Sequence, residues 1–241
     1  MTSAETRRAE LSAGLEAVRD RIERACDGAG RDPAEITLVV VTKYFPGTDV
    51  LLLHELGVRD IGENRDQEAG EKVEQVRSVL RERGADPVTA HFIGQLQTNK
   101  AGRVAGYADV VQSVDRAKLA RALARGAAAA DRRVRVLLQV SLDGDTSRGG
   151  VTAEAAPELA REVAAQDGLD LAGVMAVAPR GADPDVSFAR LREVASGIRA
   201  EHPGADWISA GMSGDLEAGV RQGATHLRVG TAILGSRPPL L

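Results

Sequence analysis

Short apolar segments alternate with helix-sized stretches along the whole chain, and this alternation limits the possible folds more than any other feature. Each segment has the length of a buried strand and is followed by enough chain for a helix. With 241 residues, the chain is close to the ~250 residues typical of a (β/α)8 barrel. The strands predicted in this way are 36–41, 58–61, 88–93, 108–112, 134–140, 169–177, 207–209 and 226–229.

The alternation predicts one α/β domain over residues 1–241, with a (β/α)8 TIM barrel at 36–235 and an extra N-terminal helix in 1–30. A doubly wound open sheet is the alternative, because it is built from the same strand and helix units. The barrel is favoured because every predicted strand precedes a helix-sized stretch and the chain ends soon after the eighth strand. The extra helix is expected to plug one end of the barrel.

Composition and charge predict a cytoplasmic protein that binds neither nucleic acid nor membrane. The net charge is −4, whereas a nucleic-acid-binding surface needs a basic surplus. Cys26 is the only cysteine, so no disulfide can form within the chain, which fits a reducing compartment. The first residues lack an apolar leader, and no apolar run reaches transmembrane length. A closed barrel core without an exposed apolar stripe predicts a monomer.

The first predicted strand ends in a lysine that is a candidate for covalent chemistry. Lys43 follows a run of β-branched residues at 36–41, where the carboxyl end of a barrel strand faces the ligand-binding mouth. Of the 31 basic residues only four are lysine, namely Lys43, Lys72, Lys100 and Lys118. A primary amine can attack an aldehyde and form a Schiff base, which a guanidinium cannot. The alternative is an ordinary lysine that reaches solvent.

The segments after the last two strands indicate a phosphate site. Ser213 lies at the start of a helix predicted at 213–222, and Gly230 and Thr231 follow the eighth strand. Barrels often bind phosphate with these two loops, although a helix cap and a tight turn would use the same residues. Together with Lys43, they favour a phosphorylated aldehyde or ketone, either pyridoxal phosphate or a sugar phosphate. The histidines are widely separated, so no metal site is expected.

Four motifs in order resemble one known family. VVTKYFP, GENRDQEA, HFIGQLQTNK and MSGDLEAGVRQGATHLRVGTAILGSR are similar to segments of the pyridoxal phosphate homeostasis proteins, and the match covers residues 36–237. The resemblance implies the fold of the N-terminal barrel of alanine racemase and pyridoxal 5'-phosphate as the cofactor. It assigns Lys43 to a covalent aldimine, Asn64 to the cofactor ring, Arg228 to the pyridine nitrogen, and Ser213, Gly230 and Thr231 to the phosphate.

The resemblance also implies a protein that binds, buffers and delivers pyridoxal phosphate, with PLP-dependent apoenzymes as partners and no catalytic residue. Racemization normally needs acid/base groups on both faces of the substrate carbon. Alanine racemases take the second group from another domain, whereas this sequence ends at Leu241. Its tyrosines are Tyr44 and Tyr107, and on a strand Tyr44 would point away from Lys43. A PLP-dependent amino-acid racemase and a class I Schiff-base aldolase acting on a sugar phosphate remain the alternatives.

Overall fold

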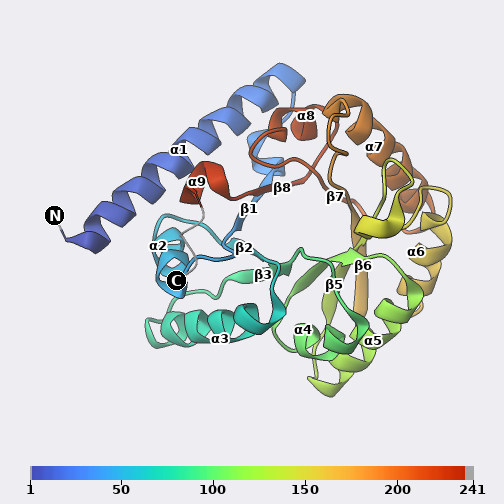
Figure 1. Cartoon of the computed structure of the whole chain (residues 1–241), viewed down its shortest axis with the longest axis horizontal. Coiled ribbons are helices and arrows are strands. Elements are labelled where there is room, and N and C mark those ends of the chain that lie inside the picture. Colours follow the sequence, from blue (N-terminus) through green and yellow to red (C-terminus); the bar gives the residue numbers. More distant parts are fainter. Residues whose placement is uncertain (1, 237–241) are drawn as a thin grey trace.

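Eight parallel strands close into a barrel in the computed structural model, which describes residues 2–236. β1 pairs with β2 on one side and with β8 on the other, so the ring has no open edge. This confirms the predicted (β/α)8 barrel and excludes the open sheet (Figure 1). The strands are β1 (Thr37–Val41), β2 (Asp60–Glu63), β3 (Thr89–Phe92), β4 (Val110–Val114), β5 (Val134–Gln139), β6 (Leu169–Met175), β7 (Trp207–Ser209) and β8 (His226–Val229).

Helices surround the strands as an outer ring (Figure 1). Within residues 2–236, no helix is both long enough and apolar enough to cross a membrane. The helices are α1 (Ser3–Ala29), α2 (Gly47–Glu55), α3 (Asp66–Glu82), α4 (Ala101–Tyr107), α5 (Ala117–Ala129), α6 (Ala156–Ala164), α7 (Pro184–Glu201), α8 (Leu216–Arg221) and α9 (Thr231–Leu234), with short 3-10 turns η1 (Pro33–Glu35), η2 (Thr98–Lys100) and η3 (Thr146–Arg148).

Two strands begin two residues later than the apolar pattern predicted. The second strand was predicted from residue 58 and the fourth from residue 108, but β2 begins at Asp60 and β4 at Val110. Val58 and Ala108 are nevertheless buried. They pack in the loops that lead into the strands, and an apolar pattern does not separate such residues from the strand itself.

The N-terminal helix does not plug the barrel, so this expectation was wrong. α1 lies along the outside and packs against α2, α8 and α9 (Figure 1). Its buried residues form one stripe that includes Leu11, Leu15 and Val18, whereas a plug would be buried on all sides. A Cβ on Gly14 would lie 2.6 Å from the carbonyl oxygen of Ile233. α1 therefore contacts the backbone of α9 directly and holds the segment that follows β8.

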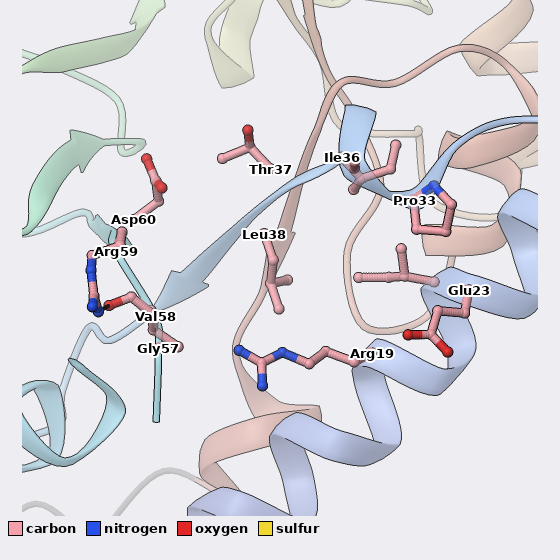
Figure 2. A pocket seen from close by; sticks show the side chains of 12 residues that line it. Arg19, Glu23, Pro33, Ile36, Thr37, Leu38, Gly57, Val58, Arg59 and Asp60 are labelled. Atoms are coloured by element: carbon pink, nitrogen blue, oxygen red, sulfur yellow. Dashed lines mark hydrogen bonds between the residues drawn. The ribbon is translucent and has the colours of Figure 1, made fainter. Parts of the chain in front are cut away.

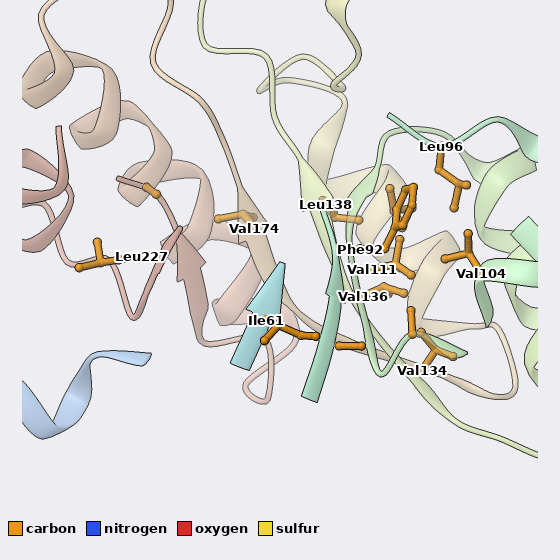
Figure 3. Packing of buried hydrophobic residues seen from close by; sticks show 14 of the residues in the cluster. Ile61, Phe92, Leu96, Val104, Val111, Val134, Val136, Leu138, Val174 and Leu227 are labelled. Atoms are coloured by element: carbon orange, nitrogen blue, oxygen red, sulfur yellow. The ribbon is translucent and has the colours of Figure 1, made fainter. Parts of the chain in front are cut away.

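The core consists of two clusters, one on each side of the strand wall. Because strand side chains alternate between faces, Val111 packs outward under the helices while its neighbour Val110 faces the barrel interior. Figure 3 shows outward-facing residues, among them Phe92, Val111 and Val136. The interior cluster combines Val110, Leu137, Ala172 and Met175, with Trp207 packed against them.

Candidate functional site

The predicted site residues all lie at the carboxyl ends of four consecutive strands. β7, β8, β1 and β2 are neighbours in the ring, so the segments that follow them lie along one side of the barrel mouth. In a (β/α)8 barrel this end carries the ligand site. The residues are Lys43 after β1, Asn64 after β2, Ser213 after β7, Arg228 within β8, and Gly230 and Thr231 after β8.

A tight turn carries Lys43. The N–H of Phe45 donates to the carbonyl of Thr42 at 3.0 Å, and Tyr44 adopts a left-handed φ of 71°, which is uncommon for a bulky residue. The Lys43 amine lies 6.0 Å from the Tyr44 ring centroid. The expectation that Tyr44 points away from Lys43 was therefore wrong, because β1 ends at Val41 and the alternation of a strand does not reach Tyr44.

The buried ion pair of Lys72 and Glu63 holds this turn in place. The Lys72 ammonium donates to the carbonyls of Thr42 and Phe45, both at 2.9 Å, and lies 2.7 Å from a Glu63 carboxylate oxygen. The Thr42 hydroxyl donates to the same carboxylate oxygen at 2.6 Å. The side chains of Lys72 and Glu63 are only 10% and 3% exposed. Lys72 therefore clamps both ends of the turn that presents Lys43.

Asn64 presents an acceptor that no residue in the described part of the chain uses. Its Oδ1 atom is buried and has no hydrogen-bond partner among the described residues, and an unpaired buried acceptor costs about 1–3 kcal/mol. Gly94 lies against it, because a Cβ at that position would be 2.6 Å from the Asn64 carbonyl oxygen. The bare backbone at Gly94 thus allows the loop after β3 to pack on Asn64.

The loops after β7 and β8 meet through their hydroxyl groups. The Thr231 hydroxyl donates to the Ser213 hydroxyl at 3.2 Å, and the N–H of Ala232 points at the same oxygen at 3.4 Å. Within residues 2–236, the backbone N–H groups of Ser213, Gly214 and Thr231 have no acceptor. Hydroxyl and amide donors converging from two loops are suited to an anion such as phosphate.

One detail of the predicted phosphate site was wrong. Ser213 does not start a helix, because α8 begins only at Leu216 and a turn intervenes. The carboxylate of Asp215 accepts the N–H of Met212 at 2.6 Å and stabilises this turn. Gly230 lies against β1, where a Cβ would be 3.2 Å from the Val41 carbonyl oxygen. The hydroxyl pair therefore adjoins the strand that leads to Lys43.

Arg228 is a buried cation without a carboxylate partner in the described part of the chain. Its guanidinium donates to the Ser209 hydroxyl at 2.6 Å and to the carbonyl of Ala176 at 2.8 Å. Burial lowers the pKa of Arg228 to about 10, and the charge of Asp215 opposes this shift. The group therefore stays protonated at neutral pH and remains a hydrogen-bond donor.

Some supporting residues were not predicted from the sequence. Lys72 lies in a polar helix, where lysine is common, so nothing in the sequence marks it. Glu63 ends a short strand, and only a carboxylate at that buried position could have drawn attention. Ser209 ends β7, and its contact with Arg228 depends on how the two strands pair, which no local pattern states. His91 is also buried, and it is hydrogen-bonded to Asp60 at 2.9 Å.

Cavities lie at both ends of the barrel. One of about 390 Å3 at the mouth is bordered by Asn64, Gln95 and Lys100. Another of about 530 Å3 lies at the opposite end between α1 and the starts of β1 and β2, and includes Asp60 (Figure 2). Only the cavity at the mouth contains a predicted site residue. No cluster of His, Cys, Asp and Glu within residues 2–236 could hold a metal ion.

Comparison with protein families and sequences gives one consistent result. The model of the alanine racemase N-terminal domain matches residues 14–238. The pyridoxal phosphate homeostasis protein of Mycobacterium tuberculosis (strain H37Rv) is 44% identical, covering 96% of this chain and 94% of that protein. The protein of the same name from Escherichia coli (strain K12) is 34% identical, covering 95% and 97%.

Solved structures agree with this result. The PipY protein of Synechococcus elongatus PCC7942 with PLP bound has a TM-score of 0.78 at 29% identity, covering 93% of this chain and 100% of that one. A protein from Bifidobacterium adolescentis has a TM-score of 0.90 at 34% identity, covering 97% of both. Alanine racemase from Corynebacterium glutamicum shares the fold, with a TM-score of 0.62 at 15% identity and coverage of 91% of this chain and 60% of the racemase.

Proposed function

We propose a function on the premise that this chain belongs to the alanine racemase N-terminal domain family and, within it, to the pyridoxal phosphate homeostasis proteins. The protein binds pyridoxal 5'-phosphate and takes part in the homeostasis of this cofactor. The PLP-bound structure of PipY, which aligns over nearly the whole chain, supports the same ligand. The single observation that carries the proposal is the hydroxyl pair of Ser213 and Thr231 beside the strand that leads to Lys43.

The residues present fit the chemistry of this cofactor. The N–H groups of Ser213, Gly214 and Thr231, which have no acceptor within residues 2–236, suit the phosphate oxygens. The Arg228 guanidinium suits an unprotonated pyridine nitrogen. The buried Oδ1 of Asn64 supplies an acceptor that a bound group would satisfy. When bound, pyridoxal phosphate supplies an aldehyde that an amine can capture reversibly.

Lys43 is the residue that we assign to covalent capture. A bond forms between its Nζ atom and the aldehyde carbon, and the carbonyl oxygen leaves as water, so the step needs no further reactant. Lys72 cannot serve in its place, because its ammonium is already committed to two carbonyls and to Glu63. The buried clamp on the Lys43 turn limits the motion of the amine and so lowers the entropy cost of capture.

We propose further that the protein holds and releases the cofactor without a catalytic activity of its own, as a cytoplasmic monomer that supplies PLP-dependent apoenzymes. The homeostasis names of the relatives support this role. An arginine facing the ring nitrogen keeps that nitrogen unprotonated, which weakens the electron sink on which carbanion chemistry depends.

An amino-acid racemase is the second candidate, because Tyr44 is close to Lys43. Tyr107 is not available for such a role, since it is buried beneath α3 and desolvation raises the pKa of its hydroxyl. Incubation of the loaded protein with L-alanine and chiral analysis of the product separates the two functions. A holder leaves the L-isomer unchanged, whereas a racemase produces D-alanine and loses that activity in Tyr44→Phe.

Titration with pyridoxal phosphate tests the binding itself. The wild-type protein is expected to develop a visible absorption band that borohydride bleaches, and Lys43→Ala is expected to lack it. Lys118→Ala is the matched control, because Lys118 is an exposed lysine on α5. Equal bands in wild type and Lys43→Ala would contradict the assignment of Lys43, and a protein that stays colourless would contradict the proposed ligand and suit a sugar-phosphate aldolase.

A further inference from the structure

A chain of hydrogen bonds crosses the barrel interior from the mouth to the opposite end. It starts at Arg228, whose guanidinium donates to the Ser209 hydroxyl at 2.6 Å. Ser209 donates to Gln112 Oε1 at 2.7 Å, and Gln112 Nε2 contacts His91 Nδ1 at 2.9 Å. His91 Nε2 then contacts the Asp60 carboxylate at 2.9 Å. Asp60 borders the cavity at the far end (Figure 2).

Every bond in this chain runs in one direction. Asp60 is a carboxylate and only accepts, so His91 must carry a proton on Nε2. Gln112 Nε2 faces Nδ1 of the same ring at 2.9 Å and, as an amide nitrogen, can only donate, so Nδ1 accepts. The Gln112 oxygen therefore faces Ser209 and takes its hydroxyl proton. Ser209 is left with lone pairs toward Arg228, as a cation requires.

We propose that Gln112 and His91 are positioning residues that, through Ser209, hold the Arg228 guanidinium in the orientation in which it meets the cofactor ring. This inference rests on the proposed function. Arg228 has no carboxylate partner in residues 2–236, so its place depends on neutral acceptors. Without the lone pair of His91, the Gln112 amide could rotate and turn its N–H groups toward Ser209. The Ser209 hydroxyl would then lose its acceptor and could turn its proton toward Arg228, which removes the lone pair that Arg228 needs.

His226, which lies near His91 in the barrel interior, offers a matched control for His91. His226 is buried to a similar degree, at 4% exposed against 1% for His91, and the two ring centroids are 6.2 Å apart. His226 stands outside the chain, because its Nδ1 contacts the Thr225 hydroxyl at 2.8 Å and its ring stacks on Trp207. Replacing either histidine by leucine removes a buried imidazole from the same part of the barrel interior, but only His91→Leu interrupts the chain of hydrogen bonds.

Cofactor binding in paired variants tests the proposal. His91→Leu is expected to shift the visible absorption maximum of bound pyridoxal phosphate and to raise its Kd about tenfold, which corresponds to the loss of one net hydrogen bond. His226→Leu is expected to leave both unchanged. Asp60→Asn keeps an acceptor for His91 and should behave as wild type, whereas Asp60→Leu should behave as His91→Leu. Equal effects of His91→Leu and His226→Leu, or no effect of His91→Leu, would overturn the proposal.

Nitrogen-15 NMR of the histidine rings in cofactor-free protein provides an independent measurement. His91 is expected as the neutral form with its proton on Nε2, and this state should survive in Asp60→Asn. A proton on Nδ1 of His91 would overturn the proposed direction of the chain. This result is read from the wild-type protein, so it holds even if a variant fails to fold. Because the NMR result needs no cofactor, it also separates the two claims: absence of pyridoxal phosphate binding by wild type refutes the proposed function, whereas the wrong tautomer refutes only the positioning role.

Discussion

Replacing Lys72 by methionine tests whether the turn that carries Lys43 depends on its buried clamp. The variant removes the ammonium that donates to Thr42 and Phe45 and leaves Glu63 as a buried carboxylate without its cation. Methionine keeps most of the length and apolar volume of the lysine stem. The change therefore acts mainly through charge and hydrogen bonding rather than through a cavity.

The expected loss of stability is large. Removal of one partner from a buried ion pair costs about 3–5 kcal/mol, because the other charge remains buried and unpaired. For a domain of this size, 1 kcal/mol shifts Tm by about 2–4 °C, so the expected decrease in Tm is about 6–20 °C. An exposed pair contributes only about 0–1 kcal/mol. Arg121→Met is therefore the control, because the Arg121–Glu162 pair is 51% and 43% exposed.

Urea unfolding of the single variants and of Lys72→Met/Glu63→Gln completes the test. Glu63→Gln removes the charge that Lys72→Met leaves behind, so the double variant should lose less stability than the sum of the two single losses. Cofactor binding should also weaken in Lys72→Met although Lys43 is intact. A loss below about 1 kcal/mol, or strict additivity of the two changes, would refute the clamp.

Three further outcomes are expected. Gly94→Ala should lower the free energy of unfolding by about 1–3 kcal/mol by overpacking against Asn64, and it fails as a prediction if urea unfolding is unchanged. Desolvation lowers the pKa of His226 from 6.5 to about 3. The contribution of neutral His226 to the free energy of unfolding is therefore complete above pH 6.5 and should fall by about 3 kcal/mol by about pH 4, because only the unfolded chain takes up the proton in that range. A similar fall in His226→Phe would contradict this. Thr231→Val should raise the Kd for pyridoxal phosphate about tenfold, by one hydrogen bond, but leave that for pyridoxal unchanged; equal effects on both would argue against a phosphate contact.

The strand framework could be predicted because each strand is a local pattern. The run at 36–41 is mostly apolar and β-branched, and the barrel buries Val39, Val40 and Val41, so the sequence alone identifies β1. The same local signal located Lys43 at the mouth, because a residue that follows a barrel strand must lie at that end. Ser213 and Thr231 were placed at the mouth for the same reason, although the helix start assigned to Ser213 was wrong.

Contacts between distant residues could not be predicted in this way. Lys72 meets Thr42 across 30 residues and His91 meets Asp60 across 31. The first contact depends on how α3 packs against the loop after β1, and the second on the pairing of β2 with β3. The left-handed turn at Tyr44 is imposed by the closure of the loop and not by the preference of tyrosine. The place of α1 depends on which helices leave an apolar gap, and no single segment carries that information.

Peptide mapping after borohydride reduction tests the central claim most directly. The chain has only four lysines, so a reduced pyridoxyl group can be assigned to one residue by mass spectrometry. At one equivalent of pyridoxal phosphate, the label is expected on Lys43 and absent from Lys72, Lys100 and Lys118. A label spread over the exposed lysines, or concentrated on any residue other than Lys43, would contradict capture at the barrel mouth.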